Sequence, residues 1–224
     1  MKPISDIRLF RSIVDNTDGN SFPAGFCSKH LNVMIHRIVM KLREYNFSLG
    51  EFDYLYINFT TCLQPGIIRP ANRSIDPHHK WYRYYDVGVS LETYNQLESE
   101  DANDFIIHKL QEILTTFFEF EGKYSIEECF AEAMEKGEQM MMLYKTKQTN
   151  RLTAKIYLQY LDSGKYLPHL FVNDSNQKEL LHQQLEEILD LSIIGEIQLN
   201  SKKVTIKPRK NSFTQNIKSL VVDI

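Results

Sequence analysis

The sequence predicts an α+β protein, a mainly antiparallel sheet with helices packed on one face. Apolar residues recur at helical spacing in some segments and alternate at every second position in others. The expected strands follow one another through hairpin-like connections before a helix begins, which favours antiparallel pairing over a doubly wound sheet. Hydrophobic residues make up 42% of the 224 residues and aromatic residues 12%, which is enough for a substantial core.

The first half of the chain reads as a helix followed by two strands and two further helices. The first helix covers 28–45, with the Ser28 hydroxyl as its N-cap and apolar residues at spacings of three and four. Strands are expected over 52–61, where Tyr54, Tyr56, Asn58 and Thr60 share one side, and over 80–91. The remaining expected helices cover 104–120 and 125–136.

The second half repeats the order of strand, strand and helix. Strands are expected over 139–147, 152–161 and 166–172, and a helix over 175–191 with Leu181, Leu185, Ile188 and Leu189 facing inward. A hairpin over 195–207 turns at Asn200-Ser201, and a last strand covers 219–224. The repeated order predicts two halves, 1–122 and 123–224, or one continuous domain.

Composition narrows the class of protein. No stretch of 18 apolar residues without charge is present, so no membrane span is expected. The first eleven residues lack the apolar segment of a secretory signal. The three cysteines lie far apart without CxxC spacing, which is typical of reduced thiols in the cytoplasm. We therefore expect a cytoplasmic protein that has no membrane partner.

Charge is unevenly distributed although the net charge is only −3. Residues 94–143 hold twelve acids and three bases, whereas residues 201–224 hold six bases and one acid. The acidic stretch is either a set of solvated helix faces or a surface that attracts a basic partner. The basic tail has few aromatic residues for base stacking, and a nucleic-acid partner is not expected.

Charged, histidine and tryptophan side chains are concentrated in the proline-rich connection between the strands expected over 52–61 and 80–91 and at the start of the second strand. We call this the proline-rich segment. A loop of this length in a compact domain is often functional. Its candidate binding residues are Arg69, Arg73, Asp76, His78, His79, Lys80, Trp81 and Arg83.

Several interpretations of this segment stay open. Asp76, His78 and His79 include metal-ligand types, but adjacent histidines point apart on an extended chain, and we expect no metal and no cofactor. A histidine could shuttle protons beside a phosphate held by arginine, as in phosphodiester cleavage. Arg, Trp and His are also enriched at interface centres. Alternatively, the tryptophan packs down and the charges are solvated.

Elsewhere, His108, His169 and His182 each stand alone in the sequence.

The segments FDYLYINFT and WYRYYDVGVS, with the proline-rich loop between them, resemble immunity proteins of bacterial polymorphic-toxin systems. The resemblance implies a small cytoplasmic α+β protein that binds one toxin domain and blocks it without catalysis. The acidic middle of the chain would suit a basic toxin domain.

The sequence thus favours a non-catalytic protein that inhibits or sequesters another macromolecule. The alternative is a phosphodiester-acting hydrolase that uses His78 or His79, and a third possibility is an oligomerising domain. The sequence leaves the oligomeric state and the identity of the partner open.

Overall fold

The computed structural model describes residues 2–15, 22–71, 81–120 and 124–224. The chain has an α+β fold, as the sequence predicts, with three mostly antiparallel sheets. It divides into two compact units, Met1–Gly137 and Glu138–Ile224. We call these unit 1 and unit 2. Helix α4 (Ile126–Lys136) belongs to unit 1, because the boundary falls at Gly137 and not after residue 122 as in the two predicted halves.

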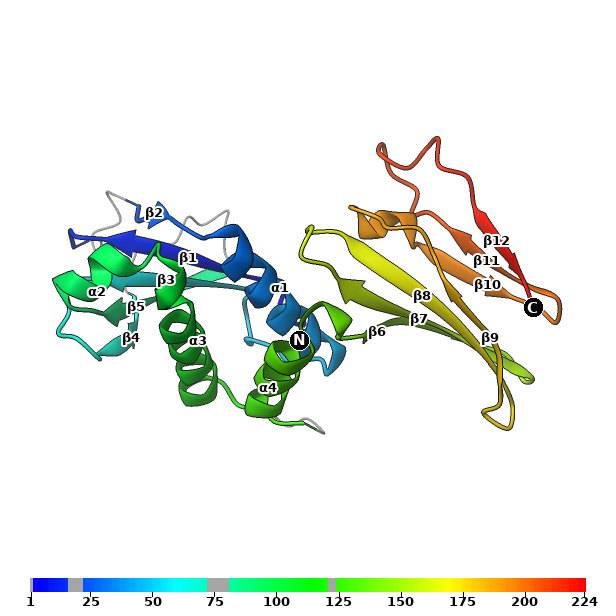
Figure 1. Ribbon diagram of the computed structural model, residues 1–224, viewed down its shortest axis with the longest axis horizontal. Helices are drawn as coiled ribbons and strands as arrows, with labels where there is room; N and C mark the ends of the chain where they lie inside the picture. Colours follow the sequence, from blue (N-terminus) through cyan, green and yellow to red (C-terminus); the bar gives the residue numbers. More distant parts are fainter. Residues whose placement is uncertain (1, 16–21, 72–80, 121–123) are drawn as a thin grey trace. The chain divides into compact units, whose positions relative to one another are not determined.

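Unit 1 is a five-stranded sheet with helices on one face (Figure 1). The strand order is β2-β1-β3-β5-β4. The strands are β1 (Asp6–Ser12), β2 (Ala24–Gly25), β3 (Tyr54–Thr60), β4 (Ile68–Pro70) and β5 (Tyr82–Gly88). The helical elements are α1 (Lys29–Glu44), α2 (Leu91–Gln96), η1 (Glu100–Ala102), α3 (Asn103–Phe117) and α4. The short helix η2 (Gly137–Gln139) spans the boundary between the units.

The expected antiparallel pairing is wrong at the centre of this sheet. Strand β3 pairs parallel with both β1 and β5. Helix α1 supplies the crossover that returns the chain from β1 to β3 in the same direction. Between β3 and β5 the chain forms β4, which folds back antiparallel on β5 and takes the edge.

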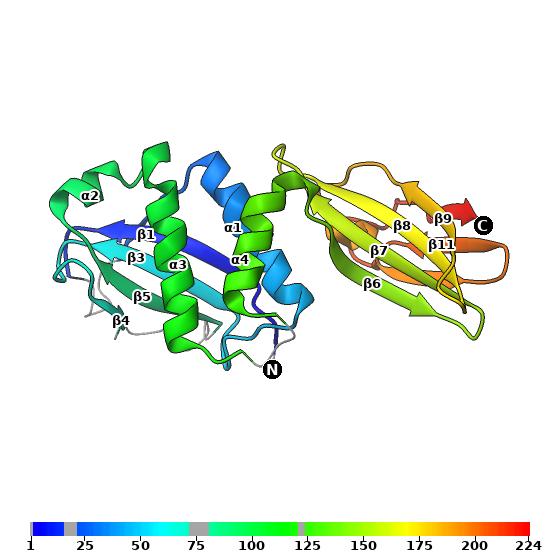
Figure 2. The same ribbon diagram turned by 60° about the horizontal axis from the view of Figure 1, so that its bottom comes forward.

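The helix predictions of the first half are confirmed, and for α1 and α4 the caps show why. The Ser28 hydroxyl accepts a hydrogen bond from the Leu31 backbone N–H at 3.2 Å and begins α1. Ser125 and Glu128 form a reciprocal capping box at the start of α4. Figure 2 shows α1, α3 and α4 lying across the same face of the sheet. On that face Leu55, Ile57 and Phe59 of β3 are fully buried.

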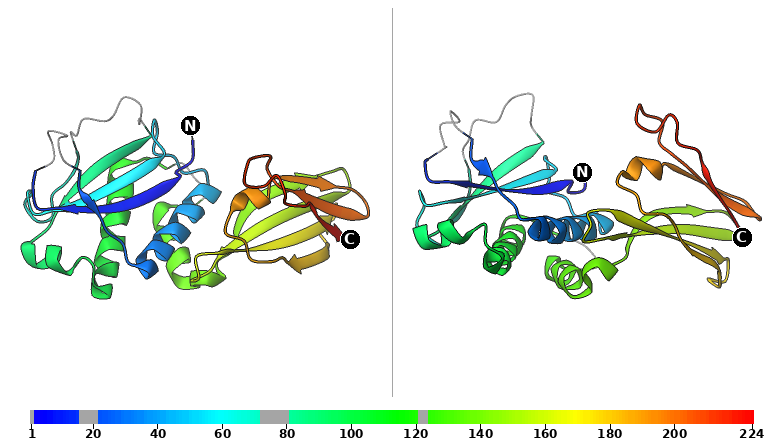
Figure 3. Two further views of the ribbon diagram at one scale, coloured as in Figure 1. Left: turned by 90° about the horizontal axis from the view of Figure 1, so that it is seen from above. Right: turned by 45° about the horizontal axis from the view of Figure 1, so that its top comes forward.

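Unit 2 is built from two antiparallel sheets that face one another (Figure 3). The first has β6 (Met142–Gln148), β7 (Leu152–Tyr160), β8 (Tyr166–Asp174) and β9 (Glu179–Gln184) in sequence order. The second has β10 (Glu196–Leu199), β11 (Lys203–Lys207) and β12 (Leu220–Asp223), with the short helix η3 (Leu191–Ile193) before it. Residues such as Ile156, Leu158, Val204 and Ile206 form its core.

The helix expected over 175–191 is wrong, and every residue of that segment is described. Asp174 accepts hydrogen bonds from the backbone N–H groups of Asn176 at 2.8 Å and Lys178 at 2.9 Å, which turns the chain back on itself. The chain then pairs with the edge of β8 as β9. Leu189, expected to face inward, is 73% exposed. Pairing with an available sheet edge outweighs the helical spacing of the leucines.

Candidate functional site

The candidate site of unit 1 lies at the carboxyl ends of its three parallel strands. In open sheets this edge commonly holds ligands, because loops and helix starts gather there. In register, Ser12 of β1 faces Thr60 of β3, and Asn58 of β3 faces Asp86 of β5. We call Ser12, Asn58, Thr60 and Asp86 the polar cluster. All four side chains are buried, which is unusual for residues of these types.

Hydrogen bonds hold this cluster together. The Asn58 amide donates to an Asp86 carboxylate oxygen at 2.8 Å and is 3.1 Å from the Ser12 hydroxyl oxygen. Its own oxygen, Oδ1, is buried, and no group in the described part of the chain donates a hydrogen bond to it. A buried acceptor without a donor costs free energy, so such groups commonly bind water or a ligand. A cavity of about 10 Å³, lined by Asn58, Asp86 and Arg69 among others, adjoins it and has room for one water molecule.

Acidic residues follow directly after β5, at the same edge of the sheet. They are Glu92, Glu98, Glu100, Asp101 and Asp104, all exposed, and we call them the acidic rim. Its position beside the strand ends is fixed by Arg11 near the end of β1, whose guanidinium pairs with Glu98 at 2.6 Å. The same guanidinium lies over the Tyr94 ring of α2, 5.6 Å from its centroid.

Aromatic side chains line the sheet face opposite the helices, where Tyr56 and Tyr84 are buried and Phe10, Tyr54 and Tyr82 are half-buried. This surface comprises Arg8, Phe10, Tyr54, Tyr56, Tyr82 and Tyr84, and we call it the tyrosine face. The Tyr56 and Tyr82 rings stack at 4.7 Å, and Phe10 contacts Tyr56 and Tyr84 at 5.0 and 5.2 Å. The Arg8 guanidinium lies at the edge of this face, 5.6 Å from the Tyr54 centroid, and pairs with Asp6 at 2.8 Å. Aromatic and arginine side chains of this kind anchor protein interfaces.

The structure separates the described candidate residues of the proline-rich segment. Arg69 lies on β4 directly opposite Asp86 and lines the small cavity, so it belongs to the site. Trp81 is 42% exposed and its ring lies 6.4 Å from that of Tyr82, beside the tyrosine face. Arg83 alternates to the other face of the sheet, where its guanidinium lies over Phe52. Arg73, Asp76, His78, His79 and Lys80 lie outside the described residues.

Sequence analysis missed part of this site for an identifiable reason. It predicted Tyr54, Tyr56, Asn58 and Thr60 on one side of a strand, which the register confirms. It did not predict β1, so Arg8, Phe10 and Ser12 were not connected to them. The alternating apolar residues Ile7 and Leu9 were the available signal.

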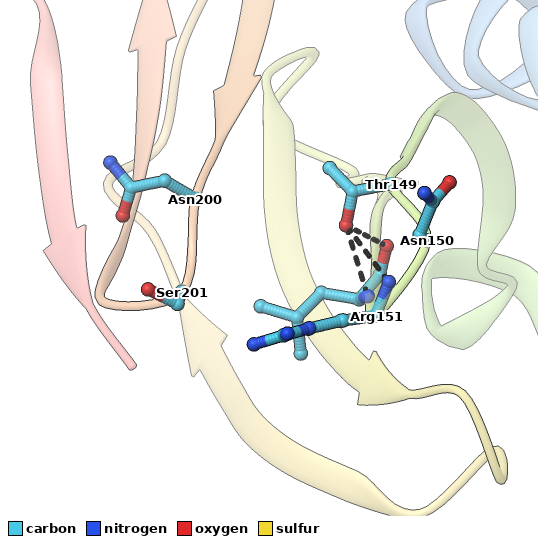
Figure 4. A pocket seen from close by; sticks show the side chains of 6 residues that line it. Thr149, Asn150, Arg151, Asn200 and Ser201 are labelled. Carbon is cyan, nitrogen blue, oxygen red and sulfur yellow. Dashed lines mark hydrogen bonds between the residues drawn. The ribbon is translucent and has the colours of Figure 1, made fainter.

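A larger hollow in unit 2 is formed by two turns. It has a volume of about 410 Å³ and is lined by residues 149–152 and 200–201. Figure 4 shows that the polar atoms of Thr149 close their own turn. The Thr149 hydroxyl oxygen accepts a hydrogen bond from the Leu152 N–H at 3.0 Å. These groups stabilise the β6–β7 hairpin, and we assign no ligand to the hollow.

Histidine positions differ from the sequence interpretation in unit 2. His169 and His182, expected to stand alone, lie on adjacent strands with ring nitrogens 3.3 Å apart. Among the described residues, no three or more His, Cys, Asp or Glu side chains gather as a metal-ligand set.

Comparison with protein-family models, curated proteins and solved structures finds no match to this chain. No helix in the described part of the chain is long and apolar enough to cross a membrane.

Proposed function

We propose that the chain is a non-catalytic binding protein that inhibits or sequesters a basic protein domain, as a toxin immunity protein does. The observation that carries the proposal is the acidic rim, which lies beside a buried polar cluster at the ligand-binding edge of the sheet. The five exposed acids would attract a basic surface over a distance of about a Debye length, roughly 8–10 Å.

Net charge supports a basic partner for unit 1 in particular. Residues 1–137 hold 14 Lys and Arg against 20 Asp and Glu, a net charge of −6. Residues 138–224 hold 12 against 9, a net charge of +3. Summed over the whole chain these give −3, so the average conceals an acidic unit.

The tyrosine face supplies the contact area that charge alone does not. Exposed ion pairs contribute only about 0–1 kcal/mol each, whereas the exposed Trp81 and the half-buried Tyr54 and Tyr82 contribute by burying the apolar surface that they still expose. We therefore expect the rim to set the association rate, and the aromatic residues to set the lifetime of the complex.

The test uses a basic domain encoded beside this chain as the partner. Binding of this partner to the full chain is measured by calorimetry and stopped flow at low and high salt. A second assay measures whether the chain reduces the partner's toxicity in cells. We expect a stoichiometric complex. The variant E92Q/E98Q/E100Q/D101N/D104N should associate at least about tenfold more slowly at low salt, because steering accelerates encounters by roughly 10 to 10³-fold.

A control variant removes acids of unit 1 that lie elsewhere. Glu127 and Glu135 are exposed on α4, which covers the helix-bearing side of the sheet. The variant E127Q/E135Q should associate nearly as fast as the unmodified chain. Slowing by both variants in proportion to the charge removed, two charges against five, would show that only net charge matters and contradict the assignment to the rim. Turnover of RNA or a cyclic nucleotide that is lost in His78→Ala or His79→Ala would instead favour the hydrolase alternative.

A further inference from the structure

A second polar cluster lies on the outer face of the four-stranded sheet of unit 2. Side chains of β7 and β8 alternate, with Ile156 and Leu170 directed into the core. The opposite face carries Tyr157, Gln159, His169 and Phe171, and β9 adds His182. Three adjacent strands therefore bring two imidazoles together on one rigid surface.

The hydrogen bonds fix which nitrogen of each histidine holds a proton. His169 Nε2 is 2.9 Å from the side-chain carbonyl oxygen of Gln159, which only accepts, so Nε2 carries the proton. In the neutral ring, His169 Nδ1 then holds a lone pair directed at His182 Nε2, 3.3 Å away. His182 Nε2 donates to it. The two facing nitrogens thus share one proton, and each is of a type that commonly coordinates metal ions.

Neighbouring aromatic rings hold both imidazoles in place. The His182 ring stacks on Phe171, with centroids 4.0 Å apart and planes at 13°. Phe171 is in turn held edge-to-face by Tyr157 at 5.5 Å. His169 is 7% exposed, and burial together with the adjacent His182 lowers its pKa. The neutral form favoured by this shift is the one that can coordinate a metal ion.

The nitrogen separation matches that of two ligands on one metal ion. Zn–N bonds are about 2.0–2.1 Å long, and at a tetrahedral angle they place the two nitrogens roughly 3.3–3.4 Å apart. The observed separation is 3.3 Å. A metal ion could replace the shared proton once each ring turns its lone pair roughly 35° off the line between the two nitrogens, as a tetrahedral angle requires. Gln159, hydrogen-bonded to the distal nitrogen of His169, occupies the place of the outer group that commonly orients a metal-bound histidine.

We propose that His169 and His182 form a two-imidazole site for a borderline transition metal ion such as Zn²⁺ or Cu²⁺, with water completing the coordination. Imidazole is a suitable ligand for both ions. His182 is exposed, which gives the ion access from solvent. With two protein ligands the site is expected to bind more weakly than a structural site with four.

The test titrates the full chain, without a histidine tag, with Zn²⁺ and separately with Cu²⁺. Calorimetry gives the affinity, and NMR of the imidazole rings identifies the histidines that bind. We expect the signals of His169 and His182 to shift first. His182→Ala should weaken binding at least about tenfold, and Gln159→Leu by roughly tenfold, the lower end of the effect seen for outer groups.

Matched controls separate this site from other histidines. His108 is exposed on α3 of unit 1, and His108→Ala should change the affinity less than twofold. The variant H78A/H79A removes the adjacent pair of the proline-rich segment and should behave in the same way. Circular dichroism confirms that each variant is folded. Unchanged binding in His182→Ala, or no binding by the unmodified chain, would overturn the proposal.

Discussion

The two units cover their sheets in different ways. In unit 1, three helices bury one face of a sheet whose central strands run parallel, and a polar cluster is buried at the strand ends. In unit 2, where all residues are described, a second sheet takes the place of helices, and the paired polar groups lie on the outer face. The units also differ in net charge, −6 against +3. Helices α1 and α4 thus begin at local caps, whereas polar clustering follows strand register.

The largest change in unfolding free energy is expected from substitutions in the two cores, which test whether each core stabilises only its own unit. Ile57 and Leu158 are fully buried in unit 1 and unit 2 respectively. Each substitution by alanine should cost about 2–5 kcal/mol, because it leaves a cavity. The only tryptophan, Trp81, is in unit 1, so its fluorescence during urea unfolding reports that unit. Ile57→Ala should lower the fluorescence midpoint, and Leu158→Ala should leave it unchanged. An equal shift in both variants would show one cooperative domain.

Acid sensitivity should also arise mainly in unit 1. Burial lowers the pKa of His36 on α1 to about 4, with Arg43 and Arg37 adding to the effect and Asp6 opposing it. Because the unfolded histidine titrates near 6.5, stability is full above that pH and falls as the pH drops toward 4. The loss approaches about 3 kcal/mol at pH 4. His36→Gln should flatten the dependence of unfolding free energy on pH in this window; an unchanged profile would contradict the assignment.

A buried lysine connects α1 to α4. Lys41 Nζ pairs with Glu44 at 2.7 Å and Glu132 at 2.9 Å, and its side chain is 4% exposed. Lys41→Met should destabilise unit 1 by about 2 kcal/mol, below the roughly 3–5 kcal/mol of a fully buried pair, because both glutamates contact water. Lys136 pairs with the same Glu132 but is 52% exposed, so Lys136→Met should cost less than about 1 kcal/mol. Equal costs, measured by urea unfolding, would contradict this reasoning.

The smallest effect compares two serines that both precede apolar periodic segments. Ser125 caps α4, and Ser125→Ala should cost about 1 kcal/mol by loss of that cap. Ser175 precedes the segment that forms β9, so Ser175→Ala removes no helix cap and should cost less than about 0.5 kcal/mol. Unfolding free energies and helical circular dichroism measure both. A loss of helicity in Ser175→Ala would indicate that this segment is helical, as the sequence predicts, and would contradict its assignment to β9.

Much of the fold was predictable because its signals are local. Ser28 and Ser125 cap helices from their own backbone neighbourhood, and the predicted hairpin at Asn200-Ser201 forms because Asn200 accepts hydrogen bonds from the next turn residues. The tyrosine side of β3 was likewise visible in its alternation.

Local signals in the sequence were enough to predict the α+β class, the capped helices and the one-sided placement of the β3 tyrosines, since each depends on residues within a few positions of one another. The parallel pairing of β1, β3 and β5, which joins Ser12 to Asn58 and Asp86, could be recognised only in the folded chain. The same holds for the edge strand over 179–184, which brings His182 to His169. These outcomes depend on which strand edges are available for pairing, and that is a property of the assembled sheet.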